Sequence, residues 1–389
     1  MLIDRRKATM LIGGIAGTLV TGRASAANKE ILIGGSVPLS GPGAAIGITA
    51  QRTFQHAVEL INAEGIEVGG DRYTLKANFY DNKYVPAEAV TVVEKLLADG
   101  TRFLFSLGSG NSVPVVAKTT AAKCLQMSMA SGKSHLTSPE FPLSFRVQPT
   151  NETAWAVYPW LKTARPNVKK IGHMNPSDEA GFTESDDRTM IAEKNGFTNI
   201  AKEFFKRGST DFYPVATRLV AANPDLIDLG GTIGRDQALG CKALRELGYK
   251  GEIMLGYSDA RSFIEVAGAS AAEGTILFDT LAEPQNQKQR DLVDWWIKTY
   301  GPPFPSFACT VWDAPFVLAE AIRKAQSADP VQIAKVMTGM EWDGLFGKSR
   351  FGMKSVYGID TTITRPIPMA VVKGGKPVQL DIVPWPANV

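Results

Sequence analysis

Short apolar runs alternate with amphipathic segments along most of the chain. Residues 30–37 are rich in isoleucine and valine and end at Pro38, which predicts a strand. In residues 50–62 the apolar side chains recur at helical spacing, and Gly65 closes that pattern. The alternation then predicts strands over 73–80, 103–107, 125–130, 169–174, 199–205, 226–229 and 252–255, and helices over 86–98, 113–122, 153–164, 185–195, 212–222 and 238–247.

This alternation of strands and helices is typical of the α/β class. Segments in this order build parallel sheets that are joined by right-handed helical crossovers. The chain has 389 residues, more than one domain usually holds, so its length fits two such sheets. We therefore expect two parallel-sheet lobes with a cleft between them.

The N-terminal segment 1–26 has the pattern of a secretory signal peptide. Its positions 1–7 are basic, positions 8–21 are apolar, and Ala24-Ser25-Ala26 is a cleavage site with small side chains. The apolar part is too short and too rich in glycine for a membrane span. Arg5-Arg6 leaves both the twin-arginine route and ordinary secretion open. Because no cysteine follows to carry a lipid, we expect a soluble mature protein in a periplasm.

Charge and cysteine content exclude several classes of protein. The net charge of +3 comes entirely from the N-terminal segment 1–26, and the rest of the chain has equal numbers of basic and acidic side chains. A balanced chain offers no basic surface to a phosphate backbone, so no nucleic-acid partner is expected. Cys124, Cys241 and Cys309 are too few for a disulfide framework or a four-ligand zinc site, and we expect them to be buried and unpaired.

Loops rich in glycine and serine follow three of the predicted strands. They are Ser40-Gly41-Pro42, residues 108–112 and residues 130–134. In an open parallel sheet the ligand crevice lies beyond the carboxyl ends of the strands, where such loops lead into helices. Backbone N–H groups and hydroxyls at that place suit a small anion such as a carboxylate. The alternative is that glycine and serine only form tight turns and helix caps.

Signatures of bound cofactors are absent from the sequence. Gly108-x-Gly110 starts a dinucleotide fingerprint, but Val113 occupies the position of its third glycine. Residues 230–234 are rich in glycine and lack the Gly-Lys-Ser/Thr ending of a phosphate-binding P-loop. We therefore expect no cofactor.

Signatures of metal binding and of hydrolysis are equally weak. His56, His135 and His173 have no metal-ligand spacing, so no metal is expected. A serine and histidine pair of Ser109 with His135 or His173 is conceivable, but no Gly-x-Ser-x-Gly elbow supports it. The sequence therefore favours binding over catalysis.

Several motifs spread over nearly the whole mature chain resemble those of one family. They are Gly34-Gly35-Ser36-Val37-Pro38-Leu39-Ser40-Gly41-Pro42, Gly47, Glu59-Leu60-Ile61-Asn62-Ala63-Glu64-Gly65, Tyr80-Asp81-Asn82, Pro86-Ala87-Glu88-Ala89-Val90, Trp312-Asp313-Ala314 and Leu318-Ala319-Glu320-Ala321-Ile322. In combination they resemble the branched-chain amino-acid-binding (Leu/Ile/Val-binding-like) family of periplasmic solute receptors of ABC transporters.

The resemblance implies a type I periplasmic-binding fold, in which two doubly wound parallel-sheet lobes are joined by a three-segment hinge. It implies that residues 27–148 and 277–361 form lobe one and that residues 149–276 and 362–389 form lobe two. It also implies a monomer that binds a small-molecule carboxylate and meets an inner-membrane ABC permease.

In lobe one, the serine with which the family binds a carboxylate matches Ser109, and Asn111 and Ser112 follow at the start of the next helix. The next contact loop matches Ser131 and Lys133, where the family commonly has threonine or serine in place of the lysine. The Lys133 ammonium either pairs with the ligand carboxylate or points to solvent. The resemblance thus agrees with the anion site expected from the loops.

In lobe two, the resemblance places Gly181, Phe182, Thr232, Tyr257 and Asp259 against the ligand. Asp259 is the candidate counter-ion for an amino group, although the glutamate usual in the family has no evident match. Two large rings of the family are also replaced, by Ile46 and Ala180, which leaves room for a bulkier guest unless Phe182, Tyr84 or Tyr257 fills the space. An amino acid and an aromatic or other organic acid therefore both remain open as ligands.

The expected function is that of a periplasmic receptor that captures a small carboxylate-bearing solute by hinge closure for an ABC importer. The alternative from another class is an amide-sensing or hydrolytic protein with the same two lobes.

Overall fold

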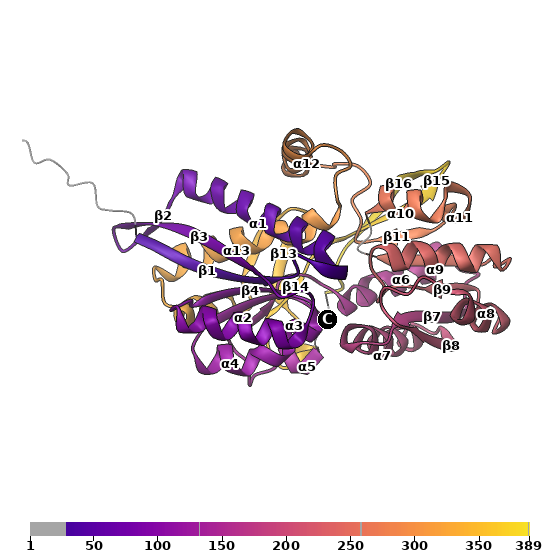
Figure 1. Ribbon diagram of the computed structural model, residues 1–389, viewed down its shortest axis with the longest axis horizontal. Helices are drawn as coiled ribbons and strands as arrows, with labels where there is room; N and C mark the ends of the chain where they lie inside the picture. The colour runs from indigo at the N-terminus through magenta and orange to yellow at the C-terminus, as the bar shows by residue number, and fades with distance from the viewer. Residues whose placement is uncertain (1–28, 132, 257–258, 388) are drawn as a thin grey trace, which may run out of the picture.

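The structure, a computed structural model, describes residues 29–131, 133–256, 259–387 and 389. In this part of the chain two separate sheets form the centres of two lobes, which lie side by side along the long axis of the molecule (Figure 1). The two-lobed α/β architecture expected from the sequence is confirmed. The expected signal peptide, residues 1–26, lies outside the described residues.

Lobe one contains a nine-stranded sheet. In order across the sheet its strands are β12 (Glu341–Gly344), β13 (Gly347–Gly352), β14 (Thr362–Thr364), β6 (Ser144–Arg146), β5 (Leu125–Met129), β4 (Phe103–Leu107), β1 (Lys29–Val37), β3 (Asp71–Asp81) and β2 (Ile66–Val68). The central pairs, from β3 through β1, β4 and β5 to β6, are parallel, as the alternation predicts. Antiparallel pairs occur only at the two edges of this sheet.

Lobe two contains a seven-stranded sheet. Its order is β16 (Lys376–Val383), β15 (Ile367–Lys373), β11 (Ile276–Phe278), β10 (Glu252–Gly256), β9 (Leu226–Asp228), β7 (Lys170–Pro176) and β8 (Thr198–Phe205). The five strands from β11 to β8 are parallel, and β15 and β16 add an antiparallel edge.

Helices accompany each sheet. Lobe one has α1 (Ala44–Glu64), α2 (Pro86–Ala98), α3 (Ser109–Ser112), α4 (Val116–Ala121), α5 (Lys133–Leu136), α13 (Phe307–Ala325), α14 (Pro330–Met337) and α15 (Lys354–Tyr357), with single 3₁₀ turns at Gly41–Gly43 and Val113–Val115. Lobe two has α6 (Ala154–Ala164), α7 (Glu179–Lys194), α8 (Tyr213–Ala221), α9 (Arg235–Glu246), α10 (Ala260–Ala267) and α11 (Ala269–Ala272), preceded by a 3₁₀ turn at Asn151–Thr153. A further helix, α12 (Gln287–Tyr300), packs on α1 through the stacked rings of Trp295 and His56.

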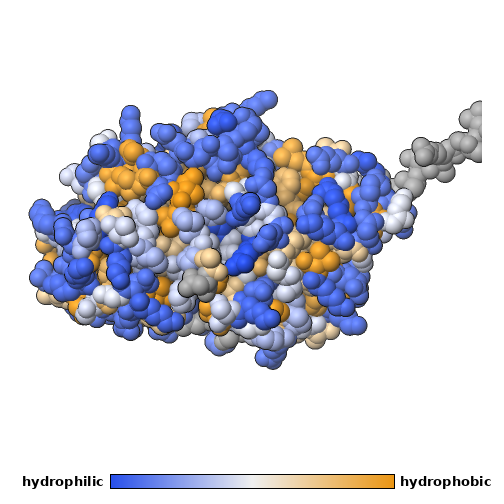
Figure 2. All heavy atoms as spheres, turned by 180° about the vertical axis from the view of Figure 1, so that it is seen from behind, coloured by the Kyte–Doolittle hydropathy of each residue, from blue (hydrophilic) through white to orange (hydrophobic). Residues whose placement is uncertain are grey.

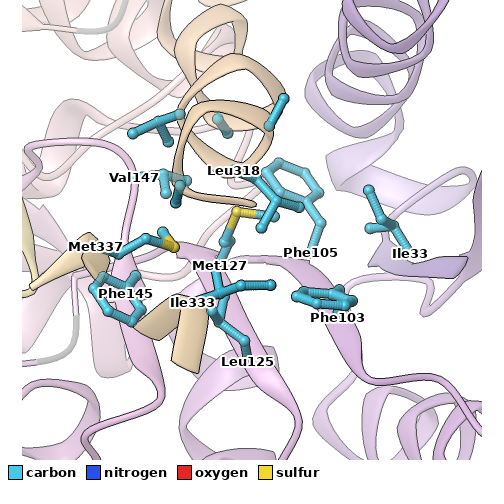
Figure 3. Packing of buried hydrophobic residues seen from close by; sticks show 14 of the residues in the cluster. Ile33, Phe103, Phe105, Leu125, Met127, Phe145, Val147, Leu318, Ile333 and Met337 are labelled. Carbon is cyan, nitrogen blue, oxygen red and sulfur yellow. The ribbon is translucent and has the colours of Figure 1, made fainter. Parts of the chain in front are cut away.

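Both faces of each sheet are covered, as successive side chains of the central strands show. In β4, Phe103 and Phe105 join the core under α1 and α13, whereas Leu104 between them joins a second core under α2. Figure 3 shows the first of these cores, where Phe105 and Met127 of the sheet meet Leu318 of α13. Strands buried on both faces explain why the sequence shows continuous apolar runs in place of a two-residue period.

The same close contact lies at the start of the helix that follows the first strand of each lobe. An added Cβ on Gly47 of α1 would lie 1.7 Å from the carbonyl oxygen of Pro38, and one on Gly181 of α7 would lie 1.9 Å from that of Pro176. Only glycine fits at such distances. Each proline directly follows or ends a strand, so the two glycines bring the helix starts against the strand ends that face the other lobe.

Three segments connect the lobes: one from β6 to α6, one from β11 towards α13, and one from β14 to β15. Two of the expected boundaries need small corrections. β11 ends at Phe278 and belongs to the sheet of lobe two, while β14 ends at Thr364 and pairs with β13 and β6 in lobe one. The lobe changes therefore come slightly later along the chain than expected, because these strands extend their sheets up to the hinge. No helix among the described residues is long and apolar enough to cross a membrane.

Candidate functional site

A small cavity lies between the lobes, at the carboxyl ends of strands from both sheets. Its volume is about 80 Å³, and since one water molecule needs roughly 10–15 Å³ of such space, it has the size for a small organic molecule. It is lined by Ile46, Tyr84, Leu107, Gly108, Ser109, Met129, Ala130, Ser131, Gln148, Thr150, Ala180, Glu184, Arg207, Gly230, Gly231, Ile233 and Phe307.

Lobe one supplies two hydroxyl groups to this cavity. The N–H of Ser131 donates a 2.9 Å hydrogen bond to Oγ of Ser109, which leaves the hydroxyl proton of Ser109 available to an oxygen atom of a ligand. Both residues are buried and follow the neighbouring strands β4 and β5. Gly108 has a φ of +92°, and an added Cβ there would lie 2.9 Å from the ring of Tyr84. Glycine therefore lets this ring close the wall beside Ser109.

Lobe two supplies a guanidinium group from the loop after β8. Nε and Nη2 of Arg207 donate hydrogen bonds of 2.7 and 3.2 Å to Asp178, and the group lies 6.0 Å from the ring centre of Tyr84 in lobe one. Its buried Nη1 has no hydrogen-bond partner among the described residues. Burial lowers the pKa of Arg207, but the hydrogen bond and charge of Asp178 outweigh that effect and raise it. The cavity thus has a permanent cation with a free donor, which suits an anion.

Lobe two also supplies a buried carboxyl group. Glu184 of α7 is 3% exposed, and its Oε1 accepts a 2.8 Å hydrogen bond from the hydroxyl of Ser131 across the cleft. Burial raises the pKa of Glu184 to about 8, against the opposing effects of Arg188 and of the Ser131 hydrogen bond. The wall of lobe two therefore carries an acid that keeps its proton at neutral pH.

A buried ion pair between Arg188 and Asp228 lies next to Glu184. Nε of Arg188 lies 2.8 Å from Oδ2 of Asp228, and both side chains are almost fully buried. Burial alone would raise the pKa of Asp228, but Arg188, together with the hydrogen bond from Tyr158, holds that pKa below its usual value. An added Cβ on Gly230 would lie 2.3 Å from Nε of Arg188, so glycine at this position leaves room for the pair.

The first hinge segment is tied to both lobes. Arg146, at the end of β6, pairs with Glu152 inside the protein, and the hydroxyl of Tyr357 in lobe one donates to the same carboxylate. The side-chain amide of Asn151 donates to Asp187 of α7 in lobe two. The first hinge segment therefore makes polar contacts with both lobes.

Of the lobe-one residues expected at the site, Ser109 and Ser131 line the cavity. Asn111 and Ser112 do not, because the amide of Asn111 donates a 3.1 Å hydrogen bond to the carbonyl of Leu107 and the Ser112 hydroxyl bonds that of Ser106 at 2.9 Å. Lys133 begins α5, and its side chain lies outside the described part of the structure.

Of the lobe-two residues expected at the site, none of those the structure describes lines the cavity. Gly181 packs on Pro176, and Phe182 is 48% exposed and packs on Phe204 with ring centres 5.2 Å apart. Thr232 is buried and donates a 3.1 Å hydrogen bond to the carbonyl of Met174.

The candidate counter-ion for an amino group also lies elsewhere. Asp259 caps α10 by accepting from the N–H of Arg261, beside a different surface hollow. Tyr257 lies outside the described residues. The neighbours Ala180, Gly230, Gly231 and Ile233 line the cavity in place of the expected residues.

The sequence interpretation missed Glu184 and Arg207. A signal for Arg207 was present, because the residue lies two positions after the predicted strand 199–205, at its carboxyl end. Glu184 was missed because the helix was expected from residue 185 and begins at Glu179. Tyr84 was considered as a ring that fills the space, and it does line the cavity, together with Ile46 at the position where the family has a ring.

The alternative of a hydrolytic site is not supported. The ring nitrogen Nε2 of His173 is 2.7 Å from Oδ1 of Asn199, and Nδ1 of His135 lies 3.6 Å from Glu179, so neither histidine is bonded to Ser109. In the described ranges no three His, Cys, Asp or Glu side chains are placed to hold a metal ion. The three cysteines are free and buried, as expected.

A second, larger hollow lies at the opposite end of lobe two. Its volume is about 1290 Å³, and it runs past the starts of the strands, between side chains such as Lys242, Arg245 and Glu273. It is an open groove lined by charges of both signs, whereas the cavity between the lobes contains buried polar groups. Figure 2 shows a face of the molecule that is mostly hydrophilic, with hydrophobic side chains gathered in small separate areas.

Comparisons with known proteins agree with this geometry. The family model described as periplasmic binding protein matches residues 30–376. The leucine-, isoleucine-, valine-, threonine- and alanine-binding protein of Pseudomonas aeruginosa is 24% identical over 353 residues, which cover 90% of this chain and 92% of that protein. The Leu/Ile/Val-binding protein homolog 3 of Brucella melitensis is 24% identical and covers 82% of this chain and 86% of its own length.

Solved structures share the fold. An extracellular ligand-binding receptor from Rhodopseudomonas palustris has a TM-score of 0.75 at 26% identity and covers 91% of this chain and 100% of its own. The solute-binding protein of an ABC transporter from R. palustris in complex with benzoate has a TM-score of 0.76 at 16% identity, with coverages of 92% and 98%. The role that follows is solute binding without catalysis. By its sequence, its two lobes and the cavity between them, the chain belongs to the family of periplasmic binding proteins.

Proposed function

We propose that this protein is a receptor of an ABC importer that captures a small carboxylate-bearing solute between its lobes and delivers it to an inner-membrane permease. One observation carries the proposal: the cavity is lined from lobe one by Ser109, whose hydroxyl proton is free, and from lobe two by Arg207, whose Nη1 has no hydrogen-bond partner among the described residues. Hydroxyl and guanidinium donors around one small space suit a carboxylate.

The two kinds of relatives support the same chemical group. The P. aeruginosa relative is named for aliphatic amino acids and threonine, and the R. palustris structure holds benzoate. These ligands differ in size and in the presence of an amino group, but each carries a carboxylate. A carboxylate is therefore the group that we assign to the donors of the cavity.

Capture follows from the position of the cavity. A ligand that touches Ser109 of lobe one and Arg207 of lobe two gains both sets of contacts only when the lobes are closed. Such a ligand shifts the population towards the closed form by its difference in affinity for the two forms. The three connecting segments then act as the hinge, and the permease recognises the closed shape.

Several further expectations belong to this proposal. The N-terminal segment 1–26 directs export to the periplasm and is removed, and the mature protein acts as a monomer. Lys133 follows Ser131 by two positions, and its ammonium group either pairs with the ligand carboxylate or points to solvent. In lobe two the residues that line the cavity differ from the expected ones, which were Gly181, Phe182, Thr232 and Asp259. This difference does not change the proposed function.

The test is calorimetric titration of the mature protein with benzoate, phenylacetate, lactate, leucine, alanine and benzamide, together with Ser109→Ala. We expect saturable binding of at least one carboxylate, recovery of that compound unchanged, and an affinity about tenfold lower in the variant, as for the loss of one hydrogen bond of about 1.4 kcal/mol. Ser270→Ala, at an exposed serine far from the cavity, is the matched control. Binding of benzamide alone, or turnover of any compound, would overturn the proposal.

A further inference from the structure

Glu184 has a polar atom in the cavity wall that the protein leaves unused. Its Oε1 accepts the hydroxyl of Ser131, but its buried Oε2 has no hydrogen-bond partner among the residues that the structure describes. Nη1 of Arg188, one turn further along α7, lies 4.0 Å from Oε2, which is too far for a hydrogen bond. Buried polar atoms are nearly always bonded, so a partner for this atom has to come from outside the described residues, and Glu184 is one of the side chains that line the cavity.

The side chain is held in this position by its surroundings. An added Cβ on Gly231 would lie 2.9 Å from Cβ of Glu184, so the loop after β9 packs directly against the carboxyl-bearing side chain. From the other lobe Ser131 fixes the carboxyl group at 2.8 Å. Glu184 therefore belongs to the built wall of the cavity.

The cation that faces Glu184 is Arg188, whose Nη1 lies 4.0 Å from Oε2, and Glu184 shares it with Asp228. Arg188 is closer to Asp228 of β9, at 2.8 Å, than to Glu184. Glu152 of the hinge segment and Asp187 of α7 are negative and further disfavour ionisation of Glu184. From the loop after β8 the cavity contains Arg207, which is paired with Asp178.

The remaining titratable group that lines the cavity does not change this balance. It is Tyr84 of lobe one, and burial raises the pKa of its hydroxyl, so the side chain stays neutral. Among the described lining residues, a neutral Glu184 thus leaves Arg207 as the charged group at neutral pH. Because Arg207 is itself paired with Asp178, such a lining keeps a free N–H donor for an anion and offers no unpaired carboxylate to an ammonium group.

We infer that Glu184 is a specificity-determining residue: its protonated carboxyl group donates a hydrogen bond from Oε2 to the bound solute, so that the cavity selects an organic acid without an ammonium group over a zwitterionic amino acid. This inference rests on the proposed function and specifies in addition that the ligand is an anion without an ammonium group. Loss of the Glu184 proton places a second negative charge beside the ligand. Binding therefore takes up a proton when the pH is high enough for free Glu184 to ionise.

The test compares the wild type with Glu184→Gln, whose amide also donates a hydrogen bond but does not titrate. Calorimetry with benzoate, phenylacetate, lactate, leucine and alanine is carried out from pH 6 to pH 9, in two buffers that differ in their heat of ionisation. In the wild type we expect the affinity for an organic acid to be constant at low pH. Above about pH 8 the affinity should decrease, with a limiting slope of about tenfold per pH unit. Proton uptake of up to one per ligand accompanies this fall.

In Glu184→Gln we expect organic-acid affinity within about threefold of the wild type at pH 6, with neither the fall nor the proton uptake. Glu193→Gln, on an exposed position of the same helix, is the matched control and should behave as the wild type does. A merely structural role of Glu184 would not remove proton uptake while affinity is retained.

Two results overturn the inference. Tight binding of leucine or alanine that is lost in Glu184→Gln shows a charged counter-ion for an amino group, and it leaves the proposed capture of a carboxylate intact. A pH profile unchanged by the substitution shows that Glu184 does not titrate with the ligand. Absence of binding by every carboxylate in the panel, in contrast, removes the proposed function itself.

Discussion

The hydroxyl of Ser131 and Oε1 of Glu184 form a 2.8 Å hydrogen bond between two buried residues of opposite lobes. Ser131 follows a strand of the nine-stranded sheet, whereas Glu184 lies in a helix beside the seven-stranded sheet. The bond exists only while the two lobes are close together. It therefore stabilises the closed form directly, even before a ligand contributes.

Removal of this bond is predicted to favour the open form. Ser131→Ala removes the hydroxyl and leaves Oε1 of Glu184 without a hydrogen-bond donor. This raises the free energy of the closed form by about 1–3 kcal/mol. We expect a larger radius of gyration in X-ray scattering of the ligand-free variant than of the wild type. Ser270→Ala should scatter as the wild type does, and equal radii for all three proteins would contradict the prediction.

Arg207 is predicted to carry much of the affinity for an anion. Arg207→Gln removes the positive charge and the donor Nη1, and hydrogen bonds to charged groups contribute about 1.5–3 kcal/mol, so affinity should fall roughly 10-fold to 150-fold. Titration calorimetry with the tightest carboxylate measures the loss.

The matched control for Arg207 is Arg218→Gln. Arg218 is also an arginine paired with an acid, Glu203, but it is exposed and lies outside the cavity lining. An equal loss of affinity in both variants would mean that general charge, and not the position of Arg207, attracts the ligand.

Gly181 is predicted to be irreplaceable for packing. Gly181→Ala places a Cβ 1.9 Å from the carbonyl oxygen of Pro176, so the start of α7 must shift, and overpacking of this kind costs typically about 1–3 kcal/mol. The melting temperature should fall by several degrees. Gly110→Ala, where the nearest atom to the new Cβ is 3.6 Å away, should leave it nearly unchanged.

The pKa of Glu184 predicts a pH dependence of stability. The ordinary value is 4.5 and the folded protein raises it to about 8, so between these pH values the unfolded chain binds fewer protons than the folded one. The free energy of unfolding then falls as pH rises through this window, by at most about 1.4 kcal/mol per pH unit. Glu184→Gln should remove this decrease.

Urea unfolding at pH 5, 6.5, 8 and 9 tests the point. The stability of Glu184→Gln relative to the wild type should rise with pH and level off above about 8. Parallel profiles of the two proteins would show that the proton on Glu184 is not linked to folding.

Local patterns were sufficient for the elements that form the centre of each sheet. The strand over 103–107 and the helix over 86–98 were predicted with the bounds that the structure has, because apolar runs and a proline at the helix start are local signals. The antiparallel edge strands, such as β13 and β16, were not predicted. Each forms an antiparallel hairpin with the strand just before it, β12 or β15, and is half exposed, so it carries no continuous apolar run.

The site was predicted in part for the same reason. Ser109 and Ser131 lie in loops that directly follow strands, so strand order alone brings them to the cavity. Phe182 was expected there and points elsewhere, because the start of α7 is set by the contact of Gly181 with Pro176 and not by a local pattern. The same contact explains Glu184. Because α7 begins at Glu179 and not at residue 185 as expected, Glu184 lies within the first turns of the helix and lines the cavity.

The three connections between the lobes have a consequence for how the chain is made. The last strands of the sequence, from β12 to β16, complete one edge of the first sheet and one edge of the second. A nascent chain that the ribosome has released only as far as Met340 has therefore finished neither half of the molecule. Each half also consists of pieces separated in the gene, so no single contiguous fragment reproduces either one.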